Sequence, residues 1–491
     1  MPAPAPLVLG FNATHDAAAA IVRGGTVLLA VEEERLSRVK HHFGTPRRAM
    51  AACLEAAGTG WDGLEHVAFY MDPALWLRSY GLHFARHLPR SASYLGRKPA
   101  LWRSFLGVER AFRRETGFRG RFHVVEHHAA HIDSAFWPSG FPDAAALTVD
   151  GAGEADTAVI AAVDATRQRR VWRARYPQSV GKLWEAVTDW LGWQPTRDEG
   201  KVMGLAPYGD ERFVGAFRDV LRPADGGFHV DLAYTAFQFG ARRLVSDRFV
   251  AAFGAPREPD GELQDHHRAV ARALQSATED VVLALGRRAF EATGSRRLVM
   301  AGGVALNCVA NGRLLREGPF DEIFVQPAAG DNGASLGAAL QVAHRRLGTP
   351  RGPRQAHAFL GPGFEEADTL AAAARLGLEP ERPPDVVEAA ADLLAVGAVL
   401  GWMQGRTEYG PRALGHRSIL ADPRSASMRD TVNRRVKFRE AFRPFAPSVP
   451  LEAAADWCED VRPSWATRLS CRVGAARHGR ASGRTAAESS G

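Results

Sequence analysis

The fold of this chain can be read from the stretch Leu7-Val8-Leu9-Gly10-Phe11-Asn12-Ala13-Thr14-His15-Asp16. An apolar run that ends in a polar turn predicts a strand over residues 7–11. Further apolar runs, separated by a Gly-Gly turn, predict strands over residues 17–22 and 26–31. The chain therefore opens with three short strands, and the first turn carries titratable groups.

The same pattern returns in the middle of the chain. A predicted strand over residues 144–149 precedes the turn Asp150-Gly151-Ala152-Gly153-Glu154, and strands are expected over 157–163 and 171–176. The repeat predicts an α/β protein with two lobes, about residues 7–140 and 144–347, that face a cleft. This layout resembles the superfamily of actin, the heat-shock ATPases and the sugar kinases.

Helices and a further domain complete the expected organisation. Periodic apolar residues predict helices over 180–191 and 265–292, and small residues predict one over 334–347. Residues 348–357 are rich in Gly, Pro and Arg and are interpreted as a linker to a second α/β domain over 358–462. The basic stretch 463–491 has almost no apolar periodicity and is predicted to be disordered.

Composition is typical of a globular protein without a membrane span. Of 491 residues, 46% are hydrophobic and 24% charged, and no apolar run is long enough to cross a bilayer. The four scattered cysteines form no CxxC pair, which favours a reducing cytoplasm. Residues 463–491 contribute +4 of the net charge of +7, so the nearly neutral remainder disfavours a nucleic-acid partner.

Two histidines have the spacing of metal ligands. His127 and His131 are four residues apart, so on a helix their imidazoles share one face. The glutamate of a zincin motif is absent between them, so a metalloprotease is rejected, and a metal needs oxygen ligands from elsewhere. Asp150 and Asp331 are the natural candidates. Surface or capping histidines are the alternative.

Glycine turns point to phosphate binding. Gly302-Gly303 follows a predicted strand and Gly330 precedes a helix, where free N–H groups and the helix dipole favour anions. Ordinary turns have the same composition, so each motif alone is weak. The residues expected at a nucleotide are Gly151, Glu199, Gly200, Lys201, Gly302, Gly303, Asn307 and Gly330.

A basic segment lies near the end of the chain. From Arg406 to Arg443 there are nine arginines and Lys437, interleaved with glycine and proline. The planar guanidinium pairs with phosphate through two hydrogen bonds, so the segment predicts a pocket for an anionic small molecule. A solvated basic face or a nucleic-acid patch is the alternative.

Together these motifs resemble the O-carbamoyltransferases of the nodulation and antibiotic-tailoring type. The match runs in family order over about residues 7–460 and includes Asn12-Ala13-Thr14-His15-Asp16, His127-His128-Ala129-Ala130-His131, the turn at Asp150, and Gly302-Gly303-Val304-Ala305-Leu306-Asn307. The resemblance implies a TsaD-like, actin-like domain over residues 1–347 and a YrdC-like domain over 358–462. The implied reaction uses ATP to convert carbamoyl phosphate into carbamoyl adenylate. A hydroxyl of a small natural product or sugar then takes the carbamoyl group.

The resemblance also implies residue roles. The metal ligands fall on His127, His131, Asp150 and Asp331, and the metal is expected to be iron(II) or another divalent ion. The carbamoyl-phosphate-binding residues fall on Arg412, Arg417, Lys437 and Arg443. The expected catalytic residues, which orient or deprotonate the acceptor hydroxyl, are His15 and Lys40.

The match is expected to end near Val461, before the last strands of the YrdC-like domain, so the second domain is predicted to be incomplete. Two functional classes stay open: a carbamoyltransferase, and an impaired remnant that binds only nucleotide and metal. The expected partners are carbamoyl phosphate and a hydroxylated acceptor, with ATP and the metal as cofactors. A homodimer is left open, and neither nucleic acid nor membrane is expected.

Overall fold

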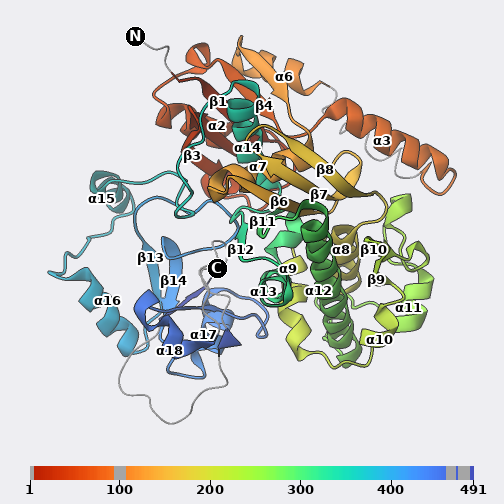
Figure 1. The fold of residues 1–491 in the computed structure, drawn as a ribbon. Helices are drawn as coiled ribbons and strands as arrows, with labels where there is room; N and C mark the ends of the chain where they lie inside the picture. Colours follow the sequence, from red (N-terminus) through yellow and green to blue (C-terminus); the bar gives the residue numbers. More distant parts are fainter. Residues whose placement is uncertain (1–4, 93–106, 460–471, 474–486, 491) are drawn as a thin grey trace. The chain divides into compact units, whose positions relative to one another are not determined.

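A computed structural model describes residues 5–92, 107–459, 472–473 and 487–490 (Figure 1). The chain divides into two compact units, of which the first ends at Ala356 and the second begins at His357. The division falls inside the stretch 348–357, which the composition marks as a linker.

Unit 1 contains two five-stranded sheets with the same topology. The strand orders are β3-β2-β1-β4-β5 and β8-β7-β6-β11-β12. In each sheet three strands form an antiparallel meander, and the last two run parallel to the first strand of that meander. The repeated α/β unit predicted from the sequence is confirmed.

Strand bounds follow the apolar runs closely. The first sheet consists of β1 (Leu7–Asn12), β2 (Ala18–Arg23), β3 (Thr26–Glu32), β4 (His66–Phe69) and β5 (Arg121–Val124). The second consists of β6 (Asp143–Val149), β7 (Asp156–Asp164), β8 (Gln168–Arg175), β11 (Arg297–Ala301) and β12 (Glu322–Val325).

Helices cover both sheets. On the first sheet α2 (Arg47–Ala56) packs against β2 and β3, and on the second α12 (Asp265–Thr293) packs against β6 and β7. The further elements of unit 1 are α1 (Glu33–Ser37), α3 (Pro73–Arg86), α6 (Val108–Thr116), α8 (Val180–Trp190), α9 (Glu199–Leu205), α10 (Val214–Phe217), α11 (Asp247–Phe253), α13 (Cys308–Glu317) and the hairpin of β9 (Leu221–Ala224) and β10 (Gly227–Val230).

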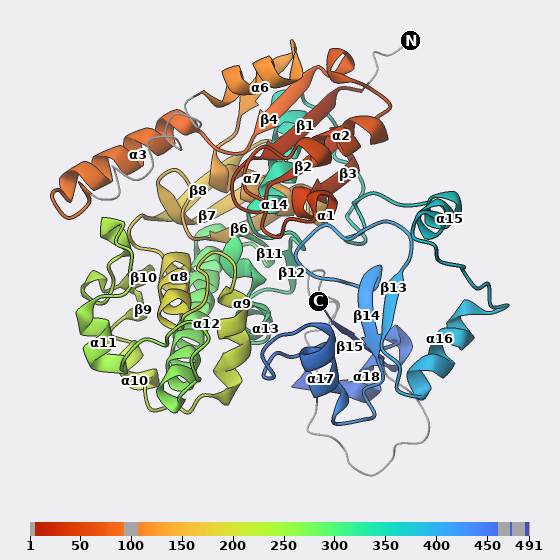
Figure 2. The ribbon, with the colours of Figure 1, turned by 180° about the vertical axis from the view of Figure 1, so that it is seen from behind.

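Two helices cross between the halves of unit 1. α7 (His127–Ser139) follows the first sheet in sequence but packs on β6 and β11 of the second. α14 (Asp331–Gln341) follows the second sheet but packs on β1 and β2 of the first, and the two helices lie side by side (Figures 1 and 2). The lobes expected from sequence order, 7–140 and 144–347, therefore exchange these helices.

The crossing requires glycine. A Cβ at Gly337 of α14 would lie 1.8 Å from the carbonyl oxygen of Ala130 in α7, and one at Gly10 of β1 would lie 2.0 Å from the carbonyl oxygen of Ser335. Real Cβ atoms do not approach so closely, so only glycine lets these backbones touch. The alanine-rich strands β2 and β6 beneath the helices serve the same close packing.

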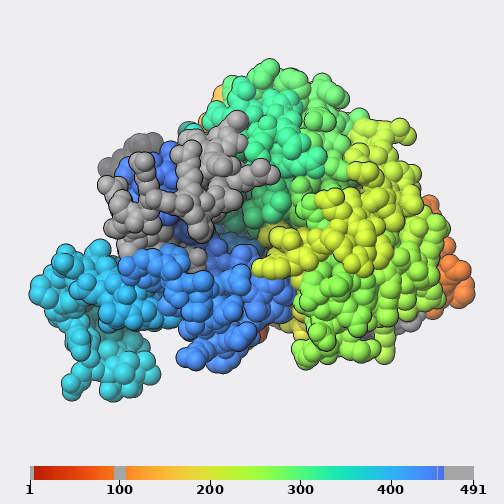
Figure 3. Space-filling model, turned by 90° about the horizontal axis from the view of Figure 1, so that it is seen from below, coloured from red at the N-terminus to blue at the C-terminus, as the bar shows by residue number. Residues whose placement is uncertain are grey.

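Unit 2 has a four-stranded antiparallel sheet in the order β13-β14-β18-β15. A small core of Ala421, Met428 and Val432 packs beside it. α15 and α16 bury no side chain and form light-blue surface in Figure 3. The elements are β13 (Leu400–Met403), β14 (Arg417–Ala421), β15 (Ala446–Ser448), β16 (Cys458–Glu459), β17 (Arg472–Val473), β18 (Ala487–Ser490), α15 (Glu366–Arg375), α16 (Val386–Ala395), α17 (Met428–Thr431) and α18 (Ala454–Trp457).

The stretch 463–491, predicted to be disordered, lies mostly outside the described residues. Its described parts are the strands β17 and β18. β18 pairs with both β14 and β15, so for these residues the structure differs from the prediction. Across the described ranges, no helix is both long and apolar enough to cross a membrane.

Candidate metal centre and anion site

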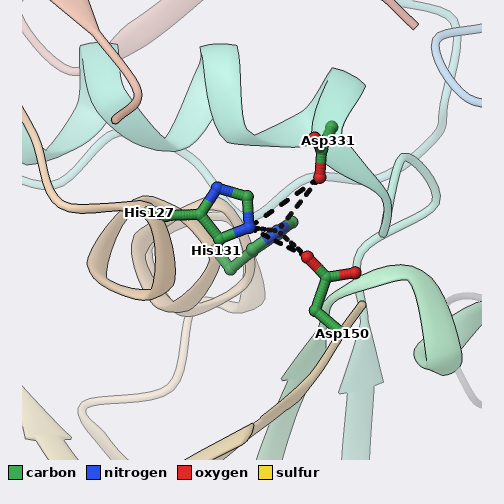
Figure 4. Close-up of side chains that lie close together, drawn as sticks. All are labelled: His127, His131, Asp150 and Asp331. Atoms are coloured by element: carbon green, nitrogen blue, oxygen red, sulfur yellow. Dashed lines mark hydrogen bonds and ion pairs between the residues drawn. The ribbon is translucent and has the colours of Figure 1, made fainter. Parts of the chain in front are cut away.

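The four predicted metal ligands meet at the N-terminal ends of α7 and α14 (Figure 4). Nε2 of His127 lies 2.9 Å from Oδ2 of Asp150, and Nε2 of His131 lies 3.5 Å from the same oxygen. Oδ1 of Asp331 lies 3.8 Å from each of the two imidazole nitrogens. One donor atom from each residue therefore falls within 4.8 Å of the others.

Local structure positions each ligand. Helix α7 begins at His127 because the carboxylate of Glu126 caps it by accepting the N–H of Ala129 at 2.7 Å. Asp331 is the first residue of α14, where the helix dipole favours a carboxylate. Asp150 follows β6, and its Oδ1 accepts the N–H of Gly303 at 2.9 Å, which leaves Oδ2 for the histidines.

The electrostatics of this centre favour a bound cation. Burial alone would lower the pKa of His127, but the carboxylates of Asp150 and Asp331 raise it to about 10. The pKa of His131 is also raised despite burial. The histidines hold the pKa of Asp150 well below its usual range although burial opposes this. Two imidazoles and two carboxylates form a donor set that fits a divalent transition metal.

A ring contact followed by a chain of hydrogen bonds links the centre to the turn after β1. The Tyr70 ring lies 5.4 Å from the His127 ring, and its hydroxyl bonds Oγ1 of Thr14. The Thr14 hydroxyl donates to Oδ1 of Asn12 at 2.9 Å, and Nδ2 of Asn12 donates to the carbonyl of His15 at 2.8 Å. The position of the turn that carries His15 is thereby tied to the metal centre.

His15 lies within the electrostatic influence of the centre. Desolvation lowers its pKa although its side chain keeps solvent contact, and the charge of Asp331 opposes the shift. An ion pair at the start of α8 also acts on it: Nζ of Lys182 lies 2.8 Å from both carboxylate oxygens of Glu185. His15, which follows β1 of the first sheet, therefore lies within the electrostatic influence of charged groups from the later half of unit 1.

Several predicted nucleotide-binding residues gather at the same place. A Cβ at Gly151 would lie 3.0 Å from Oε1 of Glu185, and one at Gly302, which has φ +94°, would lie 2.4 Å from the carbonyl oxygen of Val149. Burial and the charge of Glu185 raise the pKa of Glu199 to about 7. Gly303 binds Asp150, and Gly330 precedes α14.

Other predicted residues have different surroundings. Lys201 pairs with Asp198 at 3.2 Å. Asn307 caps α13 and exchanges two hydrogen bonds with Gln275, at 2.9 and 3.1 Å. Lys40, in the turn after α1, and Gly200, on α9, are exposed. Their predicted roles stay predictions.

In unit 2, Arg412 and Arg443 belong to a cluster that also contains Arg439. Nε of Arg439 donates to Oδ1 of Asn433 at 2.6 Å, and its guanidinium lies 4.5 Å from the centre of the Phe445 ring. Burial, together with the charges of Arg443 and Arg412, lowers the pKa of Arg439 to about 10. Burial is the largest cause of this shift, and the two neighbouring arginines add to it, so a half-buried group of like charges is present that an anion would stabilise.

Arg417 and Lys437 lie elsewhere in the same segment. The guanidinium of Arg417 donates to the carbonyls of Gln404, His416 and Gly405, at 2.7, 2.8 and 3.1 Å. Those contacts shape the loop before β14. Lys437 follows the helical turn 432–436, and its backbone N–H donates to the carbonyl of Val432 at 2.9 Å.

Sequence reasoning missed five polar residues of these sites. Lys182 and Glu185 lie in a segment that its apolar residues identify only as a helix. Arg439 is one of nine arginines, and no local pattern distinguishes it from the others. Glu154 stood at the end of the turn that begins with Asp150, and a carboxylate after two glycines was its only signal. Tyr70, beside His127, had no signal at all.

The chain belongs to the carbamoyltransferase family. The family model for the carbamoyltransferase N-terminus matches residues 7–340, and the model for the C-terminus matches residues 391–486. The second match continues past Val461, where the resemblance was expected to end. Membership implies a transferase that uses a carbamoyl donor and an acceptor.

Three relatives illustrate the similarity. An uncharacterised protein of Synechocystis is 38% identical, over 93% of this chain and 78% of the relative. Nodulation protein NolNO of Sinorhizobium fredii is 39% identical, over 91% of this chain and 64% of its own length. The 3'-hydroxymethylcephem-O-carbamoyltransferase of Streptomyces clavuligerus is 28% identical, over 91% of this chain and 79% of that enzyme.

Proposed function

We propose that this protein uses ATP to move a carbamoyl group from carbamoyl phosphate, through carbamoyl adenylate, to a hydroxyl of a small natural product or sugar. The observation that supports it most is the convergence of His127, His131, Asp150 and Asp331 beside glycine turns in a chain of this family. The repeated sheet topology supports an actin-like nucleotide-binding unit.

Unit 2 would perform the first half of the reaction. In balanced form, carbamoyl phosphate and one water give carbamate and phosphate. Carbamate oxygen then attacks the α-phosphorus of ATP, so that carbamoyl adenylate forms and pyrophosphate leaves. Arg412, Arg439 and Arg443 would neutralise the phosphate, since guanidinium groups bind phosphate in a charge-assisted way.

Unit 1 would perform the transfer. The acceptor hydroxyl attacks the carbamoyl carbon, the C–O bond to AMP breaks, and the hydroxyl proton passes to a base. His15 suits this base, because its lowered pKa leaves the imidazole unprotonated and able to accept a proton at neutral pH. The N–H groups of the first turn of α14 are suited to phosphate oxygens.

The two histidines and two aspartates would hold a divalent metal, for which we propose iron(II). A metal in that position supplies Lewis acidity toward phosphate oxygens and the leaving group. Asp150 and Asp331 would bring negative charge to hold it, while the buried histidines keep their Nε2 atoms directed at it.

An ATP–pyrophosphate exchange assay tests the first half without knowledge of the acceptor. Exchange that depends on carbamoyl phosphate is expected from the purified chain. A panel of hydroxylated sugars and natural products then tests the transfer, with AMP release and acceptor mass as readouts. Absence of carbamoyl-phosphate-dependent exchange would contradict the proposal. Nucleotide and metal binding without exchange would favour the alternative, an impaired remnant that only binds these ligands.

A further inference from the structure

We infer that Glu154 is a positioning residue of the metal centre, whose carboxylate fixes the backbone of His127 and joins the two halves of unit 1. The inference rests on the proposed metal centre, because His127 is one of its four ligands. Glu154 itself contacts no donor atom of the centre.

The carboxylate of Glu154 binds the starts of two helices. Oε1 accepts the backbone N–H of His127 at 3.0 Å, and Oε2 accepts the same N–H at 3.3 Å. Oε1 also accepts the backbone N–H of Asp72 at 2.6 Å. Glu154 is only 1% exposed, so water does not replace these contacts. One buried carboxylate therefore holds the residue that begins α7 and the residue that caps α3.

These contacts span the two halves. Asp72 comes shortly after β4 of the first sheet, and its own carboxylate caps α3 through the N–H groups of Ala74 and Leu75, at 2.9 and 3.1 Å. Glu154 lies between β6 and β7 of the second sheet. The same short turn begins with Asp150, so it supplies one metal ligand and fixes the backbone of another.

Close packing makes this geometry stiff. A Cβ at Gly153 would lie 2.9 Å from Cδ2 of His127 and 3.1 Å from Cδ2 of His128, so the turn rests directly on the helix start. His128 adds two buried contacts, from Nδ1 to Oγ1 of Thr148 at 2.8 Å and from Nε2 to the carbonyl of Asp156 at 2.8 Å. The turn and the histidine pair can therefore shift only together.

The start of α7 also offers a matched comparison. N–H groups in the first turn of a helix have no partner within the helix. The Glu126 carboxylate, which is 23% exposed and pairs with Arg170, accepts the N–H of Ala129. The buried Glu154 carboxylate instead accepts the N–H of the ligand residue His127. Both are carboxylates at one helix end, but of the two only Glu154 accepts the backbone N–H groups of His127 and Asp72.

The test compares Glu154→Ala, Glu154→Gln and Glu126→Ala in the full chain. Mn(II) serves as the probe, and its electron paramagnetic resonance signal reports the free ion. Glu154→Ala is expected to raise the dissociation constant about 10- to 100-fold, as loss of a ligand-supporting contact does. Glu154→Gln keeps an acceptor oxygen and should show a smaller rise. Glu126→Ala removes a cap of the same helix but no bond to the backbone of a ligand residue, so it should raise the dissociation constant clearly less than Glu154→Ala does.

Hydrogen–deuterium exchange of the metal-free variants gives a second readout. Glu154→Ala should exchange faster than wild type at residues 72–76 as well as at 127–131, whereas Glu126→Ala should change only the latter. Unchanged Mn(II) affinity in Glu154→Ala, or an equal loss in Glu126→Ala, overturns the inference. If the wild type itself binds no Mn(II), the proposed metal centre fails instead, and unchanged exchange at 72–76 in Glu154→Ala would still overturn the positioning role.

Discussion

Gly337 of α14 lies directly against the carbonyl oxygen of Ala130 in α7, where a Cβ would come within 1.8 Å of that oxygen. Each helix carries metal-ligand candidates at its N-terminal end. The separation of the two helix axes at this crossing therefore sets how close His131 and Asp331 can come.

Gly337→Ala should destabilise unit 1 and widen the metal centre. A buried methyl group without space costs about 1–3 kcal/mol of unfolding free energy. Denaturant unfolding followed by tryptophan fluorescence measures this. Gly81→Ala is the control, because Gly81 is also helical but has no atom within 4 Å of its Cβ position. That substitution should stabilise by about 0.5–1 kcal/mol. Equal midpoints for the two variants would contradict a tight crossing.

Asp331→Asn should weaken binding of a divalent metal by at least about tenfold, because one of two charged oxygen ligands becomes neutral. Metal content after dialysis against iron(II) or Mn(II), measured by mass spectrometry, gives the result. Asp143→Asn is the control, because this carboxylate is 58% exposed and pairs with Arg297 at 3.3 Å. Full metal content in Asp331→Asn would remove Asp331 from the ligand set.

Arg439→Ala should raise the KM for carbamoyl phosphate about 10- to 100-fold, since a charged hydrogen bond to phosphate contributes about 1.5–3 kcal/mol. Carbamoyl-phosphate-dependent ATP–pyrophosphate exchange measures it. Arg424→Ala, at an exposed arginine that pairs with Asp422 at 2.5 Å, should leave the KM unchanged. A KM at the wild-type value in Arg439→Ala would place the phosphate elsewhere.

Glu199→Gln should make stability less dependent on pH. Burial raises the folded-state pKa of Glu199 from 4.5 to about 7, so the folded protein holds this proton more tightly than the unfolded chain. Stability is therefore lost as pH rises from 4.5 to about 7. The glutamine amide removes this loss, and the variant should be more stable than wild type at pH 8 by up to about 3 kcal/mol.

The gain should vanish below about pH 4.5, where glutamate is protonated in both states. Thermal unfolding of both proteins at several pH values measures whether the stability difference has the expected sign. A variant less stable than wild type at pH 8 would show that ionised Glu199 has a favourable partner.

Much of the candidate site could be predicted because local sequence patterns, such as helical spacing and a turn after an apolar strand, mark its residues. The spacing of His127 and His131 indicates one helix face, and Asp150 follows an apolar strand in a repeated turn. The partners Tyr70 and Lys182 could not be predicted, because each lies far in sequence from the residue of the site that it approaches, His127 or His15. Arg439 could not be distinguished from the other eight arginines of its segment. Their side chains are also common in cores and on helix surfaces, so no local pattern marks them.

The sequence by itself determined the two α/β repeats and the four ligand candidates, because strand periodicity, helical spacing and turn composition are local properties. Only the tertiary structure decided that α7 and α14 exchange sheets. That exchange brings His127 and Asp331, from opposite halves of unit 1, to one centre. Its physical reason is long-range packing: glycine and alanine let two helix backbones meet between the sheets, and no local pattern specifies which sheet each helix covers.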